Sequence, residues 1–467
     1  MSAQRLWVTW LVAAMVAAVP VVTIAVEGTP GAISVGDPIV PWQGNGGFDV
    51  SHYDLDLRVD PVAGGIIAGE AVVTAEATQD LSAFSLDFVG LQIGTVEVDG
   101  VPASFERIGP DLIIEPTAVI PAGEVFETRV TYRGEPTPGP DQFVRGWWHE
   151  GESIFIVGEP AGAERWFPVN GHPSDGATYD LRLSVPERFT VVASGEPIGS
   201  STADGWTTTE WSVDREIPPY TMSFVAAEMT VEERAGPDGI ELVVAYPTGT
   251  APEVVAPFSK MPEMIETLSA CFGPLPVDRF GGVVVSDAFG AALEAENIPI
   301  YGIGAVEERT IAHEMAHQWF GNDVRLASWK DLWLNEGFAR YAEVLWVEAT
   351  EGEAAKAEML AQQREQVLFF HGPVAGAIAI ADPEADGLFN GYIYSRGALT
   401  LQALRDQVGD PTFCTILRTW HEEHAGTTGS TAEFIATAER LSGQDLTAFF
   451  EEWIFSAEVP ESIAAIP

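Results

Sequence analysis

Two histidines that could share a metal ion lie four residues apart, at His313 and His317 in the stretch His-Glu-Met-Ala-His. Residues four apart share one face of a helix, so both imidazoles can contact the same ion while Glu314 lies beside it. A further carboxylate, Glu336, follows His317 after 18 intervening residues. Hydrolytic zinc centres use about three protein ligands and leave one position open for water. The pattern therefore predicts one Zn²⁺ ion held by His313, His317 and Glu336.

The glutamate between the two histidines has a different predicted task. Zinc acidifies a bound water and polarises a carbonyl group, and a nearby carboxylate can pass the water's proton to the leaving amine. We therefore expect Glu314 to be the general base of a hydrolase. The alternative is a chance match on an ordinary amphipathic helix. Residues 329–343 argue against chance, because they place Glu336 on a second predicted helix with apolar side chains available for packing.

Residues 311–343 resemble the zinc region of the aminopeptidase N type of gluzincin metallopeptidases, including the interval between His317 and Glu336. Further similarities follow the family's order, at residues 165–168 (Arg-Trp-Phe-Pro), 272–276 (Phe-Gly-Pro-Leu-Pro) and 394–397 (Tyr-Ser-Arg-Gly). The resemblance covers roughly residues 45–457. It implies a zinc-dependent aminopeptidase that hydrolyses N-terminal residues from peptides with a free N-terminus.

The resemblance also implies an α+β multidomain fold, with a β-rich N-terminal domain followed by a thermolysin-like, mainly helical zinc peptidase domain. Apolar and polar residues alternate over residues 53–60, which predicts a half-buried strand, and strand-like runs recur up to residue 235. From about Gly239 the pattern becomes mainly helical. We expect the β-rich domain at residues 45–235 and the catalytic domain at residues 236–467.

Residues 289–301 lie where the family carries a Gly-x-Met-Glu-Asn segment, whose glutamate binds the substrate's free amino group. This chain departs from that pattern. Aligning Ala-Leu-Glu makes Glu294 the amine anchor but replaces the asparagine by alanine. Glu296 is followed by asparagine but lacks the preceding apolar residue. We prefer Glu294, and Glu296 stays the alternative.

A carboxylate that faces the ammonium group at a set distance from the zinc makes an enzyme count one residue from the N-terminus. Such a charge-assisted contact contributes about 1.5–3 kcal/mol. The resemblance places a second polar group near the same amine at Glu159, for which a solvated loop carboxylate is the alternative. Val157 stands where the family often has glutamine, so we expect one amine contact to be missing.

Tyr394 is the predicted oxyanion donor. Its Tyr-Ser-Arg-Gly run resembles the family's Tyr-Glu-Lys-Gly and lies 58 residues after Glu336. A phenol at that place can donate a hydrogen bond to the tetrahedral intermediate opposite the metal. Tyr392 is the rival candidate, and a plain core tyrosine is the alternative role. Glu343, seven residues after Glu336 on the same helix face, can hydrogen-bond a ligand imidazole.

The remaining histidines lack a convincing ligand pattern. His421 and His424 flank two glutamates but are three residues apart on a strongly acidic predicted helix, so we expect a solvated face there. No ligand spacing surrounds His149, His172 or His371.

Composition excludes some classes of partner. The chain of 467 residues carries 23 basic and 69 acidic residues, a net charge of −46. The electrostatic field of so negative a protein repels nucleic acid and anionic membrane surfaces. We therefore expect peptide substrates and no nucleic-acid partner. A salt-adapted surface and an acidic extracellular exterior explain the charge equally well.

The N-terminus carries a targeting pattern. One arginine precedes an almost uninterrupted apolar run at residues 6–26. A small-residue cleavage site at 23–25 is typical of a signal peptide, and the run is also long enough for a membrane anchor. We expect residues 1–26 to be a signal peptide or a membrane anchor. The protein is then extracellular or at the cell surface, and its membrane contact is limited to that segment. Residues 27–44 are predicted to be a linker, and the protein a monomer.

The two cysteines, Cys271 and Cys414, are 143 positions apart. Export would permit a disulfide. Two cysteines in separate apolar contexts are at least as often unpaired core residues, which we favour here. No Cys-x-x-Cys or Cys/His zinc spacing is present.

Two alternatives to an aminopeptidase stay open. One is a zinc endopeptidase without N-terminal selectivity, for which the altered pattern around Glu294 is the argument. The other is an inactive surface binding protein on a peptidase scaffold. Many family members also continue into a helical domain that covers the cleft, whereas this sequence ends soon after residue 453. We therefore expect a more open cleft that tolerates longer peptides.

Overall fold

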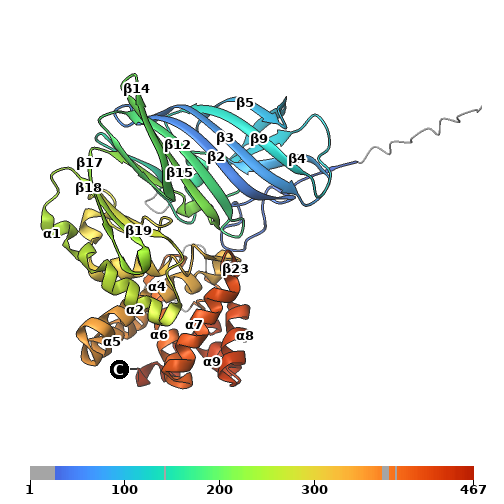
Figure 1. Cartoon of the computed structure of the whole chain (residues 1–467). Coiled ribbons are helices and arrows are strands. Elements are labelled where there is room, and N and C mark those ends of the chain that lie inside the picture. The colour runs from blue at the N-terminus through green and yellow to red at the C-terminus, as the bar shows by residue number, and fades with distance from the viewer. Residues whose placement is uncertain (1–26, 141–143, 371–377, 384–386, 467) are drawn as a thin grey trace, which may run out of the picture.

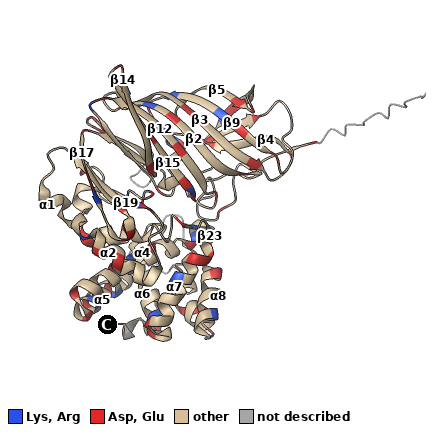
Figure 2. Ribbon diagram, in the orientation of Figure 1, with Lys and Arg blue, Asp and Glu red and all other residues tan. Residues whose placement is uncertain are grey.

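In this computed structural model two regions follow one another along the chain, one built of β-sheets and one mainly of helices (Figure 1). The predicted order of the two domains is confirmed. The structure describes residues 27–140, 144–370, 378–383 and 387–466, so the predicted signal peptide or anchor at residues 1–26 lies outside the described residues. In those described ranges, no helix has the length and apolar character needed to cross a membrane. Asp and Glu are spread over both regions (Figure 2).

An eight-stranded sheet dominates the N-terminal region. The predicted strand at residues 53–60 is part of β2 (Phe48–Asp60), where buried Tyr53, Leu55 and Leu57 alternate with exposed side chains. This alternation fits a sheet with one face on the core and one in solvent. In spatial order the strands are β14 (Glu196–Ala203), β15 (Trp206–Ile217), β12 (Ala177–Pro186), β2, β3 (Gly65–Ala77), β9 (Val125–Gly134), β5 (Gln92–Val98) and β6 (Val101–Pro102).

Two four-stranded sheets complete the N-terminal region. The first runs in the order β1 (Thr29–Pro30), β4 (Leu81–Asp87), β8 (Asp111–Glu115) and β7 (Ser104–Ile108). The second runs in the order β10 (Gly146–Glu150), β11 (Ser153–Val157), β16 (Phe224–Ala227) and β13 (Thr190–Ala193).

The second of these small sheets joins the two regions. Trp148 and Phe155 stack at 5.3 Å between ring centroids, and Phe289 of the helical region packs against Trp148 at 5.7 Å. Alternate residues of β11, Ile154 and Ile156, face the core of the N-terminal region instead. Because β11 belongs to this joining sheet, the loop that follows it, which contains Glu159, lies against the catalytic region.

A five-stranded sheet opens the helical region. Its spatial order is β17 (Met229–Ala235), β18 (Glu241–Pro247), β19 (Arg279–Val285), β21 (Ile300–Gly302) and β20 (Ala292–Leu293). β17 pairs antiparallel with β18, although it precedes the boundary expected after residue 235. We therefore propose that the catalytic domain begins before Met229.

Helices and one small strand pair make up the rest of the catalytic region. They are α1 (Pro252–Val255), α2 (Met261–Phe272), α3 (Glu308–Ala316), α4 (Trp333–Glu351), α5 (Glu353–Phe369), α6 (Gly391–Val408), α7 (Asp410–His424), α8 (Thr431–Ser442), α9 (Thr447–Phe450), β22 (Val324–Leu326) and β23 (Thr427–Gly429).

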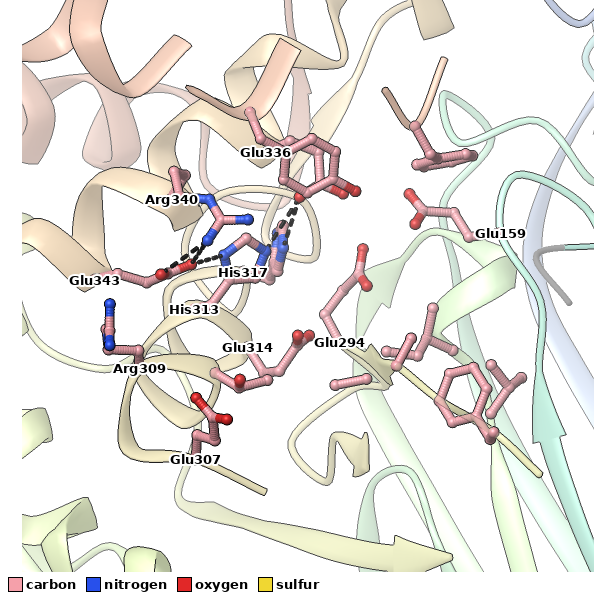
Figure 3. Close-up of a pocket in the computed structure, with 18 residues that line it drawn as sticks. Glu159, Glu294, Glu307, Arg309, His313, Glu314, His317, Glu336, Arg340 and Glu343 are labelled. Atoms are coloured by element: carbon pink, nitrogen blue, oxygen red, sulfur yellow. Dashed lines mark hydrogen bonds and ion pairs between the residues drawn. The ribbon is translucent and has the colours of Figure 1, made fainter. Parts of the chain in front are cut away.

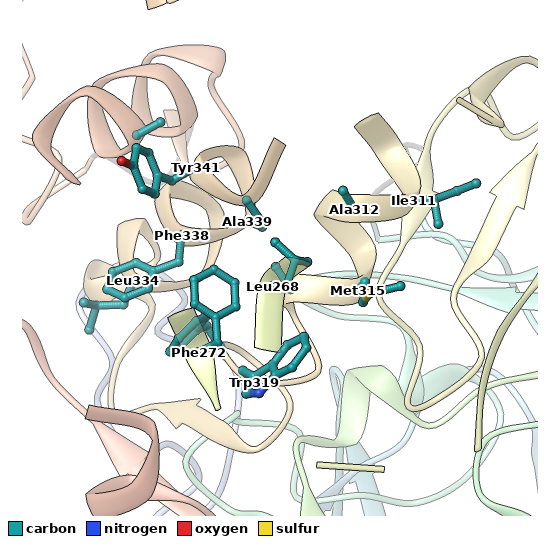
Figure 4. Close-up of a cluster of buried hydrophobic side chains, with 14 of the residues drawn as sticks. Leu268, Phe272, Ile311, Ala312, Met315, Trp319, Leu334, Phe338, Ala339 and Tyr341 are labelled. Atoms are coloured by element: carbon teal, nitrogen blue, oxygen red, sulfur yellow. The ribbon is translucent and has the colours of Figure 1, made fainter. Parts of the chain in front are cut away.

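The apolar faces of α3 and α4 pack together in a common core. Polar side chains of both helices line the same cavity. Ile311 and Met315 of α3 are fully buried, and Phe338 of α4 lies in the same core with Phe272 and Trp319 (Figure 4). Phe320 bridges the group, with its ring 5.0 Å from Phe272 and 4.8 Å from Phe338. Tight packing of this kind limits how far the two helices can shift.

The preference for unpaired cysteines is wrong. Cys271, in the last turn of α2, and Cys414, in α7, form a disulfide with their Cα atoms 4.6 Å apart. The two segments are remote in sequence, but α2 packs against α7, and that tertiary contact is absent from the local apolar patterns.

Residues 27–44 were expected to form a linker, but this segment is packed against the rest of the protein. β1 pairs in parallel with β4. Asp37, Ile39 and Val40 are buried, and Ser328 of the catalytic region donates to Asp37. The Gly and Pro content predicted flexibility, but buried side chains fasten this segment to both regions.

Candidate active site

A cavity of about 410 Å³ lies between the two regions. α3 presents His313 and Glu314 to it, and His317 follows at the C-terminal end of that helix (Figure 3). The two imidazole centroids are 4.9 Å apart, as the four-residue spacing predicts. The cavity is lined by Val157, Glu159, Phe289, Ala291, Ala292, Leu293, Glu294, Glu307, Arg309, Thr310, His313, Glu314, His317, Glu336, Arg340, Glu343, Phe389 and Tyr394.

The three predicted metal ligands come together in this cavity. Glu336, on α4, places its Oε2 atom 3.2 Å from His313 Nε2 and 3.6 Å from His317 Nε2. One ligand atom from each of the three side chains lies within 4.8 Å of the others, and all three residues are buried. This spacing suits a single small cation.

Hydrogen bonds on the far side of each imidazole orient the ligand atoms. His313 Nδ1 lies 2.9 Å from Glu343 Oε1, so Glu343 makes the predicted contact. His317 Nδ1 donates to the carbonyl of Phe320 at 3.1 Å. Both Nε2 atoms are thereby left facing Glu336, and ligating histidines normally bind zinc with the other ring N–H held in this way. Two nitrogens and one carboxylate match a hydrolytic zinc site.

Protons and a metal ion compete for the same side chains in this site. Burial opposes a charge on His313, but hydrogen bonds to Glu336 and Glu343 outweigh it and raise the imidazole pKa to about 10. Burial likewise opposes a charge on His317, yet nearby Glu294 and Glu336 raise its pKa to about 8. The pKa of Glu336 falls well below its usual range, because hydrogen bonds from both histidines outweigh its burial. The carboxylate cluster therefore holds positive charge, whether protons or a metal cation supply it.

Glu314 faces the same space from α3. One of its oxygens lies within 4.8 Å of ligand atoms of Glu294 and His317. Burial is the main cause that raises the pKa of Glu314 to about 8, while the neighbouring histidines act in the opposite direction. A bound cation lowers the pKa of an adjacent carboxyl group, so Glu314 is suited to accept a proton.

Of the two tyrosine candidates, Tyr394 lines the cavity and Tyr392 does not. The ring of Tyr394, on α6, stacks on His313 with 6.0 Å between centroids. Burial, followed by the charge of Glu336, raises its pKa well above the usual value, so the phenol keeps its proton as a donor. Tyr392 is fully buried elsewhere and accepts a hydrogen bond from Arg396.

Of the two glutamate candidates, Glu294 is the one that lines the cavity. Its Oε1 accepts a hydrogen bond from the hydroxyl of Tyr220 at 3.0 Å. Glu296 is occupied elsewhere, because Arg215 approaches it to 2.7 Å and Asn322 donates to it at 3.2 Å. The asparagine after Glu296 made that residue a candidate, but it is Glu294 that lines the cavity.

Glu159 faces Glu294 across the cavity (Figure 3). It is 6% exposed, so the alternative of a solvated loop carboxylate is wrong. Its Oε1 atom is buried without a hydrogen-bond partner among the described residues. Burial, reinforced by the charge of Glu294, raises the pKa of Glu159 well above its usual value. The site thus contains two acidic groups that a ligand with positive charge would satisfy.

Tyr220 is the residue that the sequence analysis missed. It lies in the short helix η2 (Pro219–Thr221) of the N-terminal region, 74 positions before Glu294. Its run, Pro-Pro-Tyr-Thr, carries no recognised signature. Only the tertiary contact with Glu294 identifies it.

The other histidines have structural partners. His421 is buried, not solvated as expected, and its Nε2 lies 2.6 Å from Asp323. His424 contacts the carbonyl of Trp420. His149 contacts the carbonyl of Pro61, and His172 contacts Ser174 and Asp37. His371 lies outside the described residues.

Two family models match the chain in the order that the fold suggests. The peptidase M1 N-terminal domain matches residues 50–221, and the peptidase family M1 domain matches residues 304–453, which includes the three clustered ligands. Together they cover well over half of the chain. The chain belongs to peptidase family M1.

Solved structures of this M1 family extend the likeness to the whole fold. The M1 zinc metallopeptidase from Deinococcus radiodurans is 28% identical, with a TM-score of 0.83, over 91% of this chain and 98% of that chain. A mutant of the same protein bound to the substrate Tyr-Ser-Ala is 29% identical, also with a TM-score of 0.83, over 91% of this chain and 99% of that chain.

Curated M1-type relatives are longer. Aminopeptidase N of Bos taurus is 28% identical over 265 residues, which is 51% of this chain and 28% of that protein. Aminopeptidase M1 of Arabidopsis thaliana is 24% identical over 437 residues, which is 86% of this chain and 49% of that protein. The matched part of this chain thus spans half or less of these relatives.

Proposed function

We propose that this M1-family chain is a zinc aminopeptidase that uses one zinc ion and removes N-terminal residues from peptides. The observation that carries the proposal is the pair of buried carboxylates, Glu159 and Glu294, at the opposite end of the cavity from Glu343. A buried carboxylate needs a compensating partner. In the described part of the chain neither one has an ion pair, and the substrate's ammonium group supplies that charge.

The metal end performs the hydrolysis. The chemistry that zinc supplies when bound by His313, His317 and Glu336 is Lewis acidity, which activates water and polarises the peptide carbonyl. Glu314 accepts the proton of the attacking water and donates it to the leaving amine. The Tyr394 hydroxyl donates a hydrogen bond to the oxygen on which negative charge develops.

The amine end sets where the chain is cut. Glu294 and Glu159 bind the substrate's α-ammonium group, and Tyr220 holds Glu294 in place at 3.0 Å. Charge-assisted contacts contribute about 1.5–3 kcal/mol, which corresponds to a preference of about tenfold or more for a free over a blocked amine. The relatives named aminopeptidase and the neighbour bound to Tyr-Ser-Ala support this assignment.

Matched peptides with free and N-acetylated termini test the proposal. With purified protein and added zinc, we expect kcat/KM to be at least about tenfold higher for the free peptide. Equal hydrolysis of both peptides would favour the zinc endopeptidase. No turnover of either peptide by zinc-loaded protein would favour the inactive binding protein.

Export through residues 1–26, and a monomeric state, are part of the same proposal. The Cys271–Cys414 disulfide supports export, because such bonds persist mainly in oxidising compartments. Cell fractionation of the full chain and of a variant without residues 1–26 tests the first point: retention of both inside the cell would contradict export. Light scattering of the purified protein tests the second.

A further inference from the structure

Gln43 is buried between the Glu159 loop and the catalytic region, which carries Glu294, with 5% of its surface exposed. Its Nε2 donates to the carbonyl of Pro160, the residue directly after Glu159. Its Oε1 accepts from Trp329 Nε1 at 2.6 Å. A carbonyl can only accept and an indole N–H can only donate, so the two partners determine the orientation of the amide. One side chain therefore ties the Glu159 loop to the catalytic region.

The tryptophan held by Gln43 supports the other carboxylate. Trp329 is fully buried, and its ring packs against Tyr220 with 5.7 Å between centroids. Tyr220 in turn donates to Glu294. A continuous series of contacts thus runs from the loop of Glu159 through Gln43, Trp329 and Tyr220 to Glu294.

The backbone of the Glu159 loop helps to hold the carboxylate in position. Glu159 Oε1 has no hydrogen-bond partner among the described residues, and the side-chain hydrogen bond of this carboxyl group is to Tyr220. The loop is also closely folded: a Cβ atom at Gly158 would lie 2.6 Å from the carbonyl oxygen of Ala161. Since its backbone is packed this tightly, a hydrogen bond to the Pro160 carbonyl restrains the neighbouring carboxylate.

A second anchor fastens the same N-terminal segment. Asp37 accepts hydrogen bonds from Ser328 Oγ at 2.7 Å and from the backbone N–H of Trp329 at 3.0 Å. Its other oxygen accepts from the N–H groups of Ile39 and Val40, both at 2.8 Å. Residues 37–43, here named the strap, are therefore bound at both ends to the turn that begins at Ser328.

We propose that Gln43 is a positioning residue for substrate recognition, which sets the separation of Glu159 and Glu294 and so the fit of the substrate's ammonium group. This inference rests on the proposed aminopeptidase function. It assigns a role in the site to the strap, a segment outside both family-matched ranges. Gln43 acts through the two carboxylates and does not contact the metal ligands, so zinc content and the chemical step should be preserved when it is replaced.

Replacing the amide tests the proposal. Gln43→Met keeps the length of the side chain and removes both hydrogen bonds. Each hydrogen bond typically contributes a few-fold to tenfold in an equilibrium, so we expect the free-over-acetylated ratio of kcat/KM to fall by roughly tenfold. The loss should come mainly from a higher KM for the free peptide, while kcat/KM for the acetylated peptide and zinc content stay at parent values.

Gln79→Met is the matched control. Gln79 also donates to the N-terminal segment, at Thr29 Oγ1 with a distance of 3.0 Å, but its hydrogen bonds go to Thr29 and Pro30 and not to the Glu159 loop or Trp329. Its replacement should leave the ratio unchanged. An equal loss in the Gln79 and Gln43 variants, or an equal loss for free and acetylated peptides, would show a general structural role and overturn the proposal.

Trp329→Phe gives an independent measurement if Gln43→Met does not fold. It removes the indole N–H that Gln43 accepts, keeps an aromatic ring beside Tyr220, and should lower the ratio in the same direction. Residues that act through one series of contacts are not additive, so the double variant should lose little more than either single variant. An unchanged ratio in a folded Trp329→Phe or Gln43→Met protein contradicts the inference. A parent protein without any preference for free amines contradicts the proposed function instead, which keeps the two failures distinct.

Discussion

The two ends of the cavity are built in different ways. The metal end takes His313 from α3, His317 from the end of that helix and Glu336 from α4, within 24 residues of chain, and Glu343 on the same α4 orients His313. The amine end is assembled from separate segments of both regions, which contribute Glu159, Glu294, Tyr220 and Gln43. The metal ligands and the base therefore come from one compact pair of helices, with Tyr394 added from α6, whereas selectivity depends on how the two regions are held together.

This difference predicts two kinds of damage. Changes at the metal end should reduce hydrolysis of every peptide, because each substrate needs the same reaction. Changes at the amine end should act on free peptides and spare blocked ones, because only a free amine uses those carboxylates. The following experiments compare the two ends, from the largest expected effect to the smallest.

The largest effect is expected from Glu314→Gln. The amide keeps the size of the side chain but cannot take a proton from water, so kcat should fall by about 10³-fold for every peptide substrate. Zinc content, measured by atomic absorption, should equal that of the parent, since Glu314 is not one of the three clustered ligands. Hydrolysis within tenfold of the parent rate would remove Glu314 from the role of base.

Zinc affinity should depend strongly on pH. The metal-free pKa values of about 10 for His313 and about 8 for His317 mean that both rings carry protons below pH 8. Zinc binds neutral imidazole, so it must displace these protons, and its apparent affinity should weaken by at least about tenfold per pH unit from pH 8 to pH 6. Competition with a chelator measures the effect, and a constant affinity over that range would contradict the proton competition.

An intermediate effect is expected from Glu343→Gln. Glu343 accepts from His313 Nδ1 and from Arg340, and loss of such an orienting carboxylate typically weakens metal binding by about 10–100-fold. The free-over-acetylated ratio of the zinc-saturated protein should stay at the parent value. Glu351→Gln, at an exposed position at the end of the same helix, is the control and should bind zinc like the parent. A similar loss in both variants would point to a general effect of charge.

The amine end should give the smallest change in rate but the clearest change in selectivity. Glu294→Gln removes the charge opposite the substrate's ammonium group, so the free-over-acetylated ratio should fall by about tenfold or more, with acetylated peptides unaffected. Glu296→Gln lies two residues away, where Arg215 occupies the carboxylate, and should preserve the ratio. The opposite pattern in the two variants would restore Glu296 as the amine anchor.

The same difference explains what the sequence could predict. Helix periodicity predicted that His313 and His317 share a face, the zinc motif with its interval of 18 residues predicted Glu336 as the third ligand, and the interval of seven residues predicted the contact of Glu343. The strand pattern at residues 53–60 and the order of the two domains were also local enough to predict.

The amine end was predicted only through the family resemblance, and incompletely. Glu294 and Glu296 differ little in local pattern, and it is Arg215, 81 positions away, that occupies Glu296. Tyr220 and Gln43 carry no motif at all. The strap was predicted to be a linker because its composition is rich in Gly and Pro, while its buried Asp37 bonds to residues 291 and 292 positions further along the chain. Contacts over such separations leave no periodic signal.

The most direct test of the account is a time course of products from one six-residue peptide with a free N-terminus, followed by mass spectrometry. The account predicts a ladder of peptides shortened one residue at a time from the N-terminus, together with free amino acids, and no comparable cleavage of the N-acetylated form. Internal fragments that appear first, at equal rates from both forms, would contradict an enzyme that counts from the amine.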